Sequence, residues 1–134
     1  MERLTALGDG RLSGHLGIEF VDCGDDWLRA RMPVDQRTHQ PYGRLHGGAS
    51  VALAETVGSV AGASVIDPDR FGAVGMEINA NHLRPARDGW VYATARPEAI
   101  GRTTQVWSIR IEDDAGKLVC ISRLTLAVIP LDRK

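Results

Sequence analysis

The segment from Gly47 to about Val65 constrains the fold of this chain more than any other part of the sequence. It consists almost entirely of small and apolar residues, and Glu55 is its only charged residue. We predict one long helix that ends before Asp67 and Pro68, because this pair favours a turn. The glycines lower the intrinsic helix propensity, so packing must stabilise the helix. The small side chains in turn allow a sheet to approach closely and curl around it.

Alternation of apolar and polar residues predicts strands on both sides of this helix. Upstream, Ile18–Cys23 and Trp27–Met32 are separated by turn-forming residues and are predicted to form a hairpin. Downstream, short turns separate four predicted strands, which are Val74–Leu83, Trp90–Ala99, Thr103–Asp113 and Lys117–Ile129. The last three are expected to form an antiparallel meander. The sequence therefore indicates an α+β fold in which an antiparallel β-sheet wraps one long central helix.

The rest of the chain is predicted to be short helices and an ordered loop. Glu2–Leu7 and Leu12–Leu16 suit short helices, and the polar stretch Asp35–Leu45 reads as a loop that leads into the long helix. No repeat, linker or low-complexity segment divides the sequence, and 134 residues are too few for two domains. We therefore expect residues 1–134 to form a single domain.

Charge and composition exclude several classes of function. The 16 basic and 17 acidic residues nearly cancel, so no global field attracts nucleic acid or anionic lipid. Glu55 interrupts the longest apolar stretch, which argues against a membrane span. The two cysteines lie far apart outside any CxxC pattern, and the start of the chain resembles no signal peptide, so we expect a cytoplasmic protein. The four histidines lack ligand spacing, so no metal is expected.

The loop before the long helix brings polar groups to the start of that helix. The first amides of a helix have no internal acceptors and favour negative charge, so the Gly47 amide is a candidate oxyanion donor. Glu55 is a candidate catalytic carboxylate, with Ser59 one turn beyond it. Without further information, a carboxylate on a buried helix is more often structural. A histidine such as His46, beside a helix start, is more often a cap, and Gln40 alone carries no signal.

The spacing of these two candidates predicts how the site is built. Gly47 and Glu55 are eight residues apart, or roughly 12 Å along a helix, yet both roles require contact with one carbonyl. One helix can hardly supply both groups to the same substrate. We therefore expect a composite site across a symmetric interface, which requires at least a dimer.

The residues around these candidates resemble a known family. The run from His46 to Ser59, His-Gly-Gly-Ala-Ser-Val-Ala-Leu-Ala-Glu-Thr-Val-Gly-Ser, resembles the signature of hotdog-fold thioesterases of the 4-hydroxybenzoyl-CoA and phenylacetate-pathway type. Further segments are similar to bacterial 1,4-dihydroxy-2-naphthoyl-CoA thioesterases. These segments are Met32-Pro-Val-Asp, Gln40-Pro, Gly75-Met-Glu-Ile-Asn-Ala-Asn-His and Gln105-Val-Trp. The resemblance spans nearly the whole chain and implies the hotdog fold and hydrolysis of acyl-CoA.

The resemblance also implies residue roles and an assembly. Glu55 matches the catalytic carboxylate, Gly47 the oxyanion amide, and Ser59 a supporting position. Gln40 and His46 match residues that bind or polarise the thioester carbonyl. The family implies a homodimer with a continuous sheet, and a homotetramer built from two such dimers. No cofactor is expected, since coenzyme A is part of the substrate.

The CoA contacts and the acyl group are less constrained by the sequence. Four residues near predicted strand ends are candidates for the nucleotide end of CoA: His82, Arg84, Arg102 and Thr103. Aromatic acyl-CoA is the expected substrate class, with medium-chain acyl-CoA as an extension and menaquinone formation as a pathway. Glu55 would either attack the carbonyl directly or activate water.

Three other interpretations remain open at the level of sequence. A non-catalytic acyl-CoA binding or sensing protein would use the same fold, since fold does not fix chemistry. A hydratase or dehydratase would need an acid/base pair aligned on the acyl α and β carbons, which the residues Gln40, His46 and Glu55 fit less well. A purely structural assembly protein would retain Glu55 only as a hydrogen-bonded group.

Overall fold

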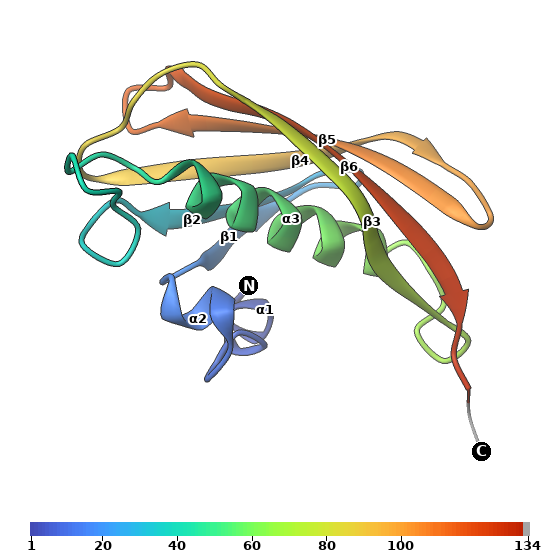
Figure 1. The fold of residues 1–134 in the computed structure, drawn as a ribbon. Coiled ribbons are helices and arrows are strands. Elements are labelled where there is room, and N and C mark those ends of the chain that lie inside the picture. Colours follow the sequence, from blue (N-terminus) through green and yellow to red (C-terminus); the bar gives the residue numbers. More distant parts are fainter. Residues whose placement is uncertain (133–134) are drawn as a thin grey trace.

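The computed structural model, which describes residues 1–132, contains one long helix on the concave side of a six-stranded sheet (Figure 1). The helix is α3, Gly47–Ala63. Two short helices, α1 (Glu2–Ala6) and α2 (Leu12–His15), precede the sheet. The strands are β1 (Glu19–Cys23), β2 (Leu28–Pro33), β3 (Phe71–His82), β4 (Trp90–Ile100), β5 (Thr104–Asp113) and β6 (Leu118–Pro130). The α+β architecture expected from the sequence, with one helix wrapped by an antiparallel sheet, is confirmed.

The strands pair in the order β1-β2-β4-β5-β6-β3, and every pairing is antiparallel. The predicted first hairpin and the β4-β5-β6 meander are therefore confirmed. The strand that follows the helix, β3, lies at one edge of the sheet and pairs only with β6 among the described strands. A bulge at Met76 separates the paired residues Gly75 and Glu77. This edge strand runs beside α3 and so becomes important for the site (Figure 1).

The buried face of α3 packs on the sheet through small residues. Ala54, Gly58 and Gly62 are buried, and a Cβ added to Gly58 would lie 2.6 Å from a Leu124 methyl carbon. A Cβ on Gly62 would meet Leu126 in the same way. The expected close approach of helix and sheet is thus confirmed. The helix ends two residues earlier than predicted, because the Ser64 hydroxyl donates to the Ala61 carbonyl oxygen at 2.6 Å and caps the last turn.

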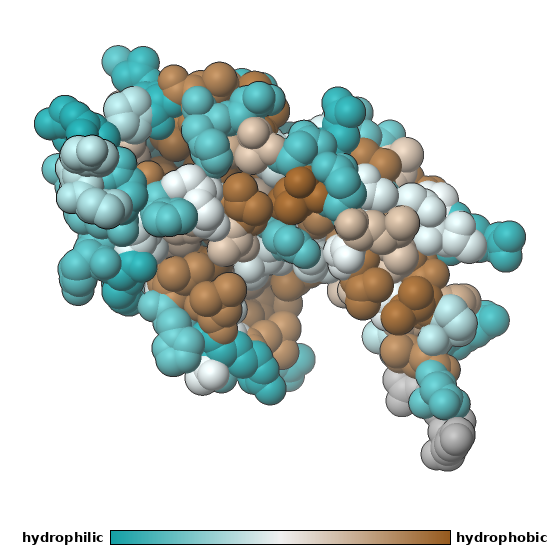
Figure 2. Space-filling view, viewed as in Figure 1, coloured by the Kyte–Doolittle hydropathy of each residue, from teal (hydrophilic) through white to brown (hydrophobic). Residues whose placement is uncertain are grey.

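Large apolar side chains are left exposed along the edge strand and its extension. Val74, Met76 and Leu83 are 45%, 64% and 55% exposed, respectively. In the space-filling view, apolar residues interrupt the hydrophilic surface over this region (Figure 2). Among the described residues, no helix has both the length and the apolar character needed to cross a membrane.

Candidate active site

The start of α3 is held by the loop that precedes it. The His46 amide donates to the Thr38 carbonyl oxygen at 2.7 Å, and the Leu45 amide donates to the Ala86 carbonyl oxygen at 2.8 Å. His46 then caps the helix, since its Nδ1 accepts a hydrogen bond from the Gly48 amide at 2.8 Å. A ring nitrogen that accepts cannot carry a proton, so the neutral imidazole has its proton on Nε2. The capping role considered from the sequence is present, and it leaves Nε2–H as a donor.

Gln40 lines a cavity at the helix start and keeps its side-chain amide nitrogen as a donor. Its Oε1 accepts a hydrogen bond from the Tyr42 amide. Because a backbone N–H can only donate, this contact fixes which end of the Gln40 amide is the oxygen. The NH2 group is therefore left as a donor on a residue that lines the cavity. A donor of this kind is what a thioester carbonyl requires.

The cavity has a volume of about 370 Å³ and lies between the start of α3, the end of β3 and the start of β6. Its lining combines polar groups with an apolar wall formed by Leu45, Leu83, Pro85 and Val119, and the remaining lining residues are Gln40, Gly47, Ser50, His82 and Arg84. Two predicted carbonyl-binding residues, Gln40 and Gly47, therefore share one cavity with two predicted CoA-binding residues.

Gly47 is needed at the cavity wall for steric reasons. A Cβ at this position would lie 3.0 Å from His82 Nε2 and 3.2 Å from its Cε1. The absence of a side chain lets the His82 ring pack against the helix start. The Gly48 amide bonds to His46 Nδ1, and the Ala49 and Ser50 amides bond to the His46 carbonyl oxygen. Half-buried Gly47 is therefore the residue of this first turn whose amide is left as a donor within the described chain, beside an imidazole.

Glu55 lies in the middle of α3, half-buried and next to the edge strand. A Cβ on Gly75 of β3 would collide with Glu55 Oε2, so the bare glycine makes room for the carboxylate. Within residues 1–132, the Glu55 carboxylate has no hydrogen bond and no ion pair with protein. The structural interpretation, in which a hydrogen bond retains Glu55, therefore finds no partner in the described part of the chain.

The two groups of candidate residues are separated within one chain. Glu55 is not among the residues that line the cavity at Gly47. Ser59, one turn beyond Glu55, is half-buried and likewise lies outside that cavity. His46 lines a neighbouring hollow on the other side of the helix start, together with Arg37 and His39 among others.

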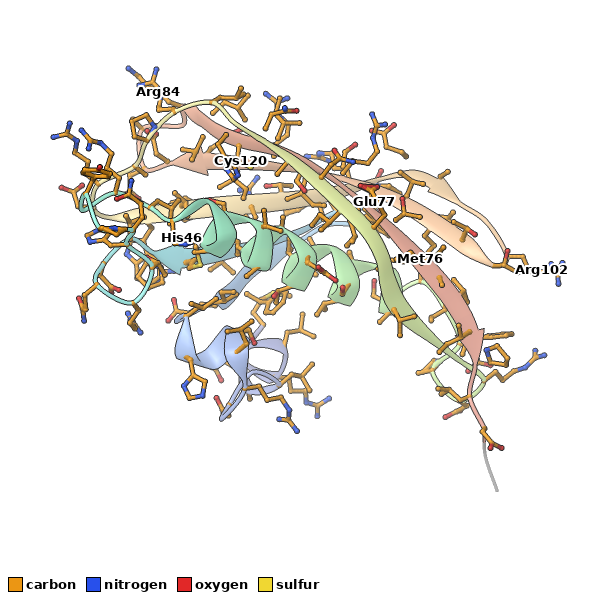
Figure 3. All side chains as sticks on the ribbon, in the orientation of Figure 1. His46, Met76, Glu77, Arg84, Arg102 and Cys120 are labelled. Carbon is orange, nitrogen blue, oxygen red and sulfur yellow. The ribbon has the colours of Figure 1, made fainter. Side chains whose placement is uncertain are left out.

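The four candidate CoA residues are divided between two ends of the molecule. His82 and Arg84 line the cavity at the start of α3. Arg102 and Thr103 lie in the turn between β4 and β5, and Figure 3 shows Arg84 and Arg102 at opposite ends of the sheet. Within one chain the two pairs lie too far apart to share one CoA, because successive connections between antiparallel strands alternate between the two ends of a sheet. A contact by Arg102 and Thr103 stays a prediction that requires another subunit.

Two residues of this region were not identified from the sequence. Ser50 lies in the cavity, and its signal was its position three residues after Gly47, on the same helix face. Gly75 accommodates the Glu55 carboxylate, a contact between separate elements that no local pattern reveals. Within the described residues, no cluster of three or more His, Cys, Asp or Glu side chains is arranged to hold a metal ion.

Comparisons with known proteins agree with this geometry. Residues 42–120 match the family model described as "Thioesterase superfamily". The chain is 52% identical over 129 residues to the 1,4-dihydroxy-2-naphthoyl-CoA hydrolase of Escherichia coli, which covers 96% of this chain and 94% of that protein. It is 50% identical over 129 residues to the proofreading thioesterase EntH of Cronobacter turicensis, covering 96% and 93% of the two chains.

Solved structures show the same similarity. A mutant thioesterase from Pseudomonas aeruginosa superimposes with a TM-score of 0.96 at 52% identity, over 97% of this chain and 94% of that chain. A thioesterase from Haemophilus influenzae gives a TM-score of 0.95 at 53% identity, over 98% and 92% of the two chains. The similarity therefore extends to the fold and to nearly the full length of the chain.

Proposed function

The chain belongs to the thioesterase superfamily with the hotdog fold and is a thioester hydrolase, and we propose that it hydrolyses aromatic acyl-CoA through Glu55. The observation that carries this proposal is the Glu55 carboxylate, which has no hydrogen bond or ion pair within the described residues, on a helix that starts with the unused Gly47 amide. Medium-chain acyl-CoA is a second substrate class. The similarity to a 1,4-dihydroxy-2-naphthoyl-CoA hydrolase supports an aromatic acyl group. We further propose a place in menaquinone formation.

The proposed site divides the chemistry between the start and the middle of the helix. The Gly47 amide donates to the thioester carbonyl oxygen, on which negative charge develops, while the Gln40 amide nitrogen and His46 Nε2–H bind the substrate around that carbonyl. Glu55 supplies the carboxylate, and Ser59 lies one helical turn away to support it or its water. The leaving thiolate is stable, so positioning and oxyanion stabilisation suffice for this reaction.

Two routes lead to the same products. In the first, a Glu55 oxygen attacks the carbonyl carbon, the carbon–sulfur bond breaks, and CoA leaves as a thiolate. Water then cleaves the resulting anhydride and regenerates the carboxylate. In the second, Glu55 takes a proton from water as the water oxygen attacks, and that proton passes to the leaving thiolate. Both routes yield the free acid and CoA.

The position of the edge strand supports a composite site. Glu55 lies against β3 at Gly75, whereas Gly47 lies against His82 at the other end of the same strand. Antiparallel pairing of two β3 edges about the middle of the strand would bring the partner's Glu55 toward the helix start of the first subunit. It would also cover exposed apolar side chains such as Met76. We therefore propose a homodimer as the catalytic unit, assembling further into a homotetramer.

The remaining proposals concern CoA and the cell compartment. His82 and Arg84 would contact CoA from the subunit that supplies the oxyanion donors, and Arg102 and Thr103 from another subunit. The two cysteines are free thiols, which suits a reducing cytoplasm.

The first experiment measures CoA thiol release from benzoyl-CoA, dihydroxynaphthoyl-CoA and a medium-chain acyl-CoA. We expect Glu55→Gln to lower kcat by at least about a hundredfold, since the amide cannot act as nucleophile or base. Glu112→Gln on β5 is the matched control, because that residue lies outside the cavity and should retain turnover. Oligomeric state is checked for each protein.

Three outcomes separate the alternatives. Collapse of turnover in a correctly assembled Glu55→Gln supports the proposal and ranks the substrates. Binding of acyl-CoA by the wild type without any hydrolysis would favour a sensing protein. Loss of stability with unchanged turnover in Glu55→Gln would assign Glu55 a structural role.

A further inference from the structure

One buried polar side chain at the cavity is left without a protein partner. Four polar residues of the described chain are buried, and these are Thr38, Ser50, Gln105 and Ser122. Thr38, Gln105 and Ser122 each form a side-chain hydrogen bond. Ser50 is 1% exposed, and its hydroxyl bonds to nothing within residues 1–132. Every fully buried side-chain nitrogen and oxygen of the described residues has a hydrogen-bond partner, so the small exposed part of Ser50 includes its oxygen, which faces the cavity that Ser50 lines. A ligand or water in the cavity can therefore form a hydrogen bond with this hydroxyl.

The position of Ser50 on α3 places this hydroxyl next to the oxyanion donors. Ser50 follows Gly47 by three residues, so the two residues share one face of the helix. Helical side chains lean toward the N-terminus, which directs the hydroxyl over the turn that begins at Gly47. Both residues line the same cavity, together with Gln40.

The direction of the cavity indicates which part of a substrate reaches Ser50. Arg84 is exposed at one side of the cavity, whereas Ser50 is buried. The charged nucleotide of acyl-CoA must stay in contact with water, because burying unpaired phosphates is costly. The thioester end is therefore the part that can enter. Its carbonyl oxygen is the strong hydrogen-bond acceptor at that end, and a hydroxyl can donate to it.

We propose that Ser50 is a further catalytic residue whose hydroxyl donates to the thioester carbonyl oxygen beside the Gly47 amide. The inference rests on the proposed thioesterase function. The hydrogen bond strengthens as the oxygen becomes an oxyanion, so it acts mainly on the chemical step. Ser50 itself gains and loses no bond to carbon in this reaction.

The test compares Ser50→Ala with Ser122→Ala, using benzoyl-CoA and correctly assembled protein. The Ser122 hydroxyl donates to the Asn79 carbonyl oxygen at 2.8 Å and lies outside the cavity, so its loss should lower stability and leave kcat unchanged. We expect Ser50→Ala to lower kcat by about tenfold or more while KM changes less than about twofold. Should Ser50→Ala fail to assemble, Ser50→Cys keeps the volume with a weaker donor and is expected to lower kcat in the same way.

Two further measurements separate a carbonyl contact from a contact with the CoA arm. Free CoA lacks the acyl carbonyl, so its inhibition constant should be the same for wild type and Ser50→Ala. In a Glu55→Gln background, bound benzoyl-CoA stays intact, and removing the Ser50 hydroxyl should shift the thioester carbonyl stretch to higher frequency. An unchanged kcat in Ser50→Ala, a weaker CoA inhibition constant or an unchanged stretch would overturn the inference. Absence of hydrolysis by the wild type would instead overturn the proposed function.

Discussion

His46 has two roles that a single substitution cannot separate. Its Nδ1 caps α3 by accepting from the Gly48 amide, and its Nε2–H is the proposed donor to substrate. His46→Ala should lower the free energy of unfolding by about 1 kcal/mol through loss of the cap, and should also lower kcat. His46→Ser restores a capping oxygen, so we expect stability to recover while kcat stays low. Thermal unfolding and turnover of both variants check this, and recovery of kcat in His46→Ser would leave His46 as a cap only.

The two thiols should differ sharply in reactivity. Cys23 is exposed, whereas Cys120 is fully buried on β6, and desolvation by burial raises the pKa of the Cys120 thiol. Because the folded chain holds this proton more tightly than the unfolded chain, Cys120 contributes stability below the usual thiol pKa. That contribution is lost as the pH rises from the usual thiol pKa through the higher pKa of Cys120 in the folded chain.

A thiol reagent at neutral pH measures this difference. One thiol per chain should react rapidly in native protein, and the second only on unfolding. Cys23→Ser should remove the rapid phase. A rapid phase that survives this substitution would mean that the region around Cys120 opens readily.

At the scale of elements, the contact between α3 and the sheet depends on Gly62. The amide of Gln105 donates to the Gly62 carbonyl oxygen at 3.3 Å, and Gln105 Oε1 accepts from Trp107 Nε1 at 2.8 Å. A Cβ on Gly62 would lie 2.6 Å from that Oε1 and would also meet Leu126. We expect Gly62→Ala to destabilise the fold by about 1–3 kcal/mol through overpacking, despite the better helix propensity of alanine.

The neighbouring residue provides the control for this prediction. Ala63 is exposed on the same helix, so Ala63→Gly should cost no more than about 1 kcal/mol of intrinsic propensity. Chemical denaturation of both variants gives the comparison. Equal stability of Gly62→Ala and wild type would show that the side chains of the sheet shift to accommodate the extra methyl group.

Local patterns predicted most elements, and long-range contacts account for what they missed. The helix and the β4-β5-β6 meander could be predicted because small residues, turns and alternation are local. The pairing of β3 with β6, and the bulge at Met76, join segments far apart in sequence. The same holds for the site. Gly47 and Glu55 are visible in the helix sequence, whereas Gly75 matters only because β3 packs on α3.

At the scale of the whole molecule, activity should depend on assembly through β3. Its outer edge has no strand partner within the described residues, and Met76 on it is 64% exposed. We expect Met76→Lys to weaken pairing of two such edges, because a charge would be buried there. Light scattering should show dissociation on dilution, with turnover per chain falling in parallel. Monomers with full turnover would show that one chain contains a complete site.

We expect variants at Gly47 and Glu55 to complement each other, because the two residues lie eight positions apart on α3 and the proposed site takes one of them from each subunit. Gly47→Val should block the helix start through His82, and Glu55→Gln removes the carboxylate, so each variant alone should be inactive. In a mixed dimer, one of the two composite sites carries both lesions and the other carries none. Random mixing of equal amounts should therefore restore about a quarter of wild-type turnover. Two variants that are each inactive on their own would then hydrolyse substrate when mixed.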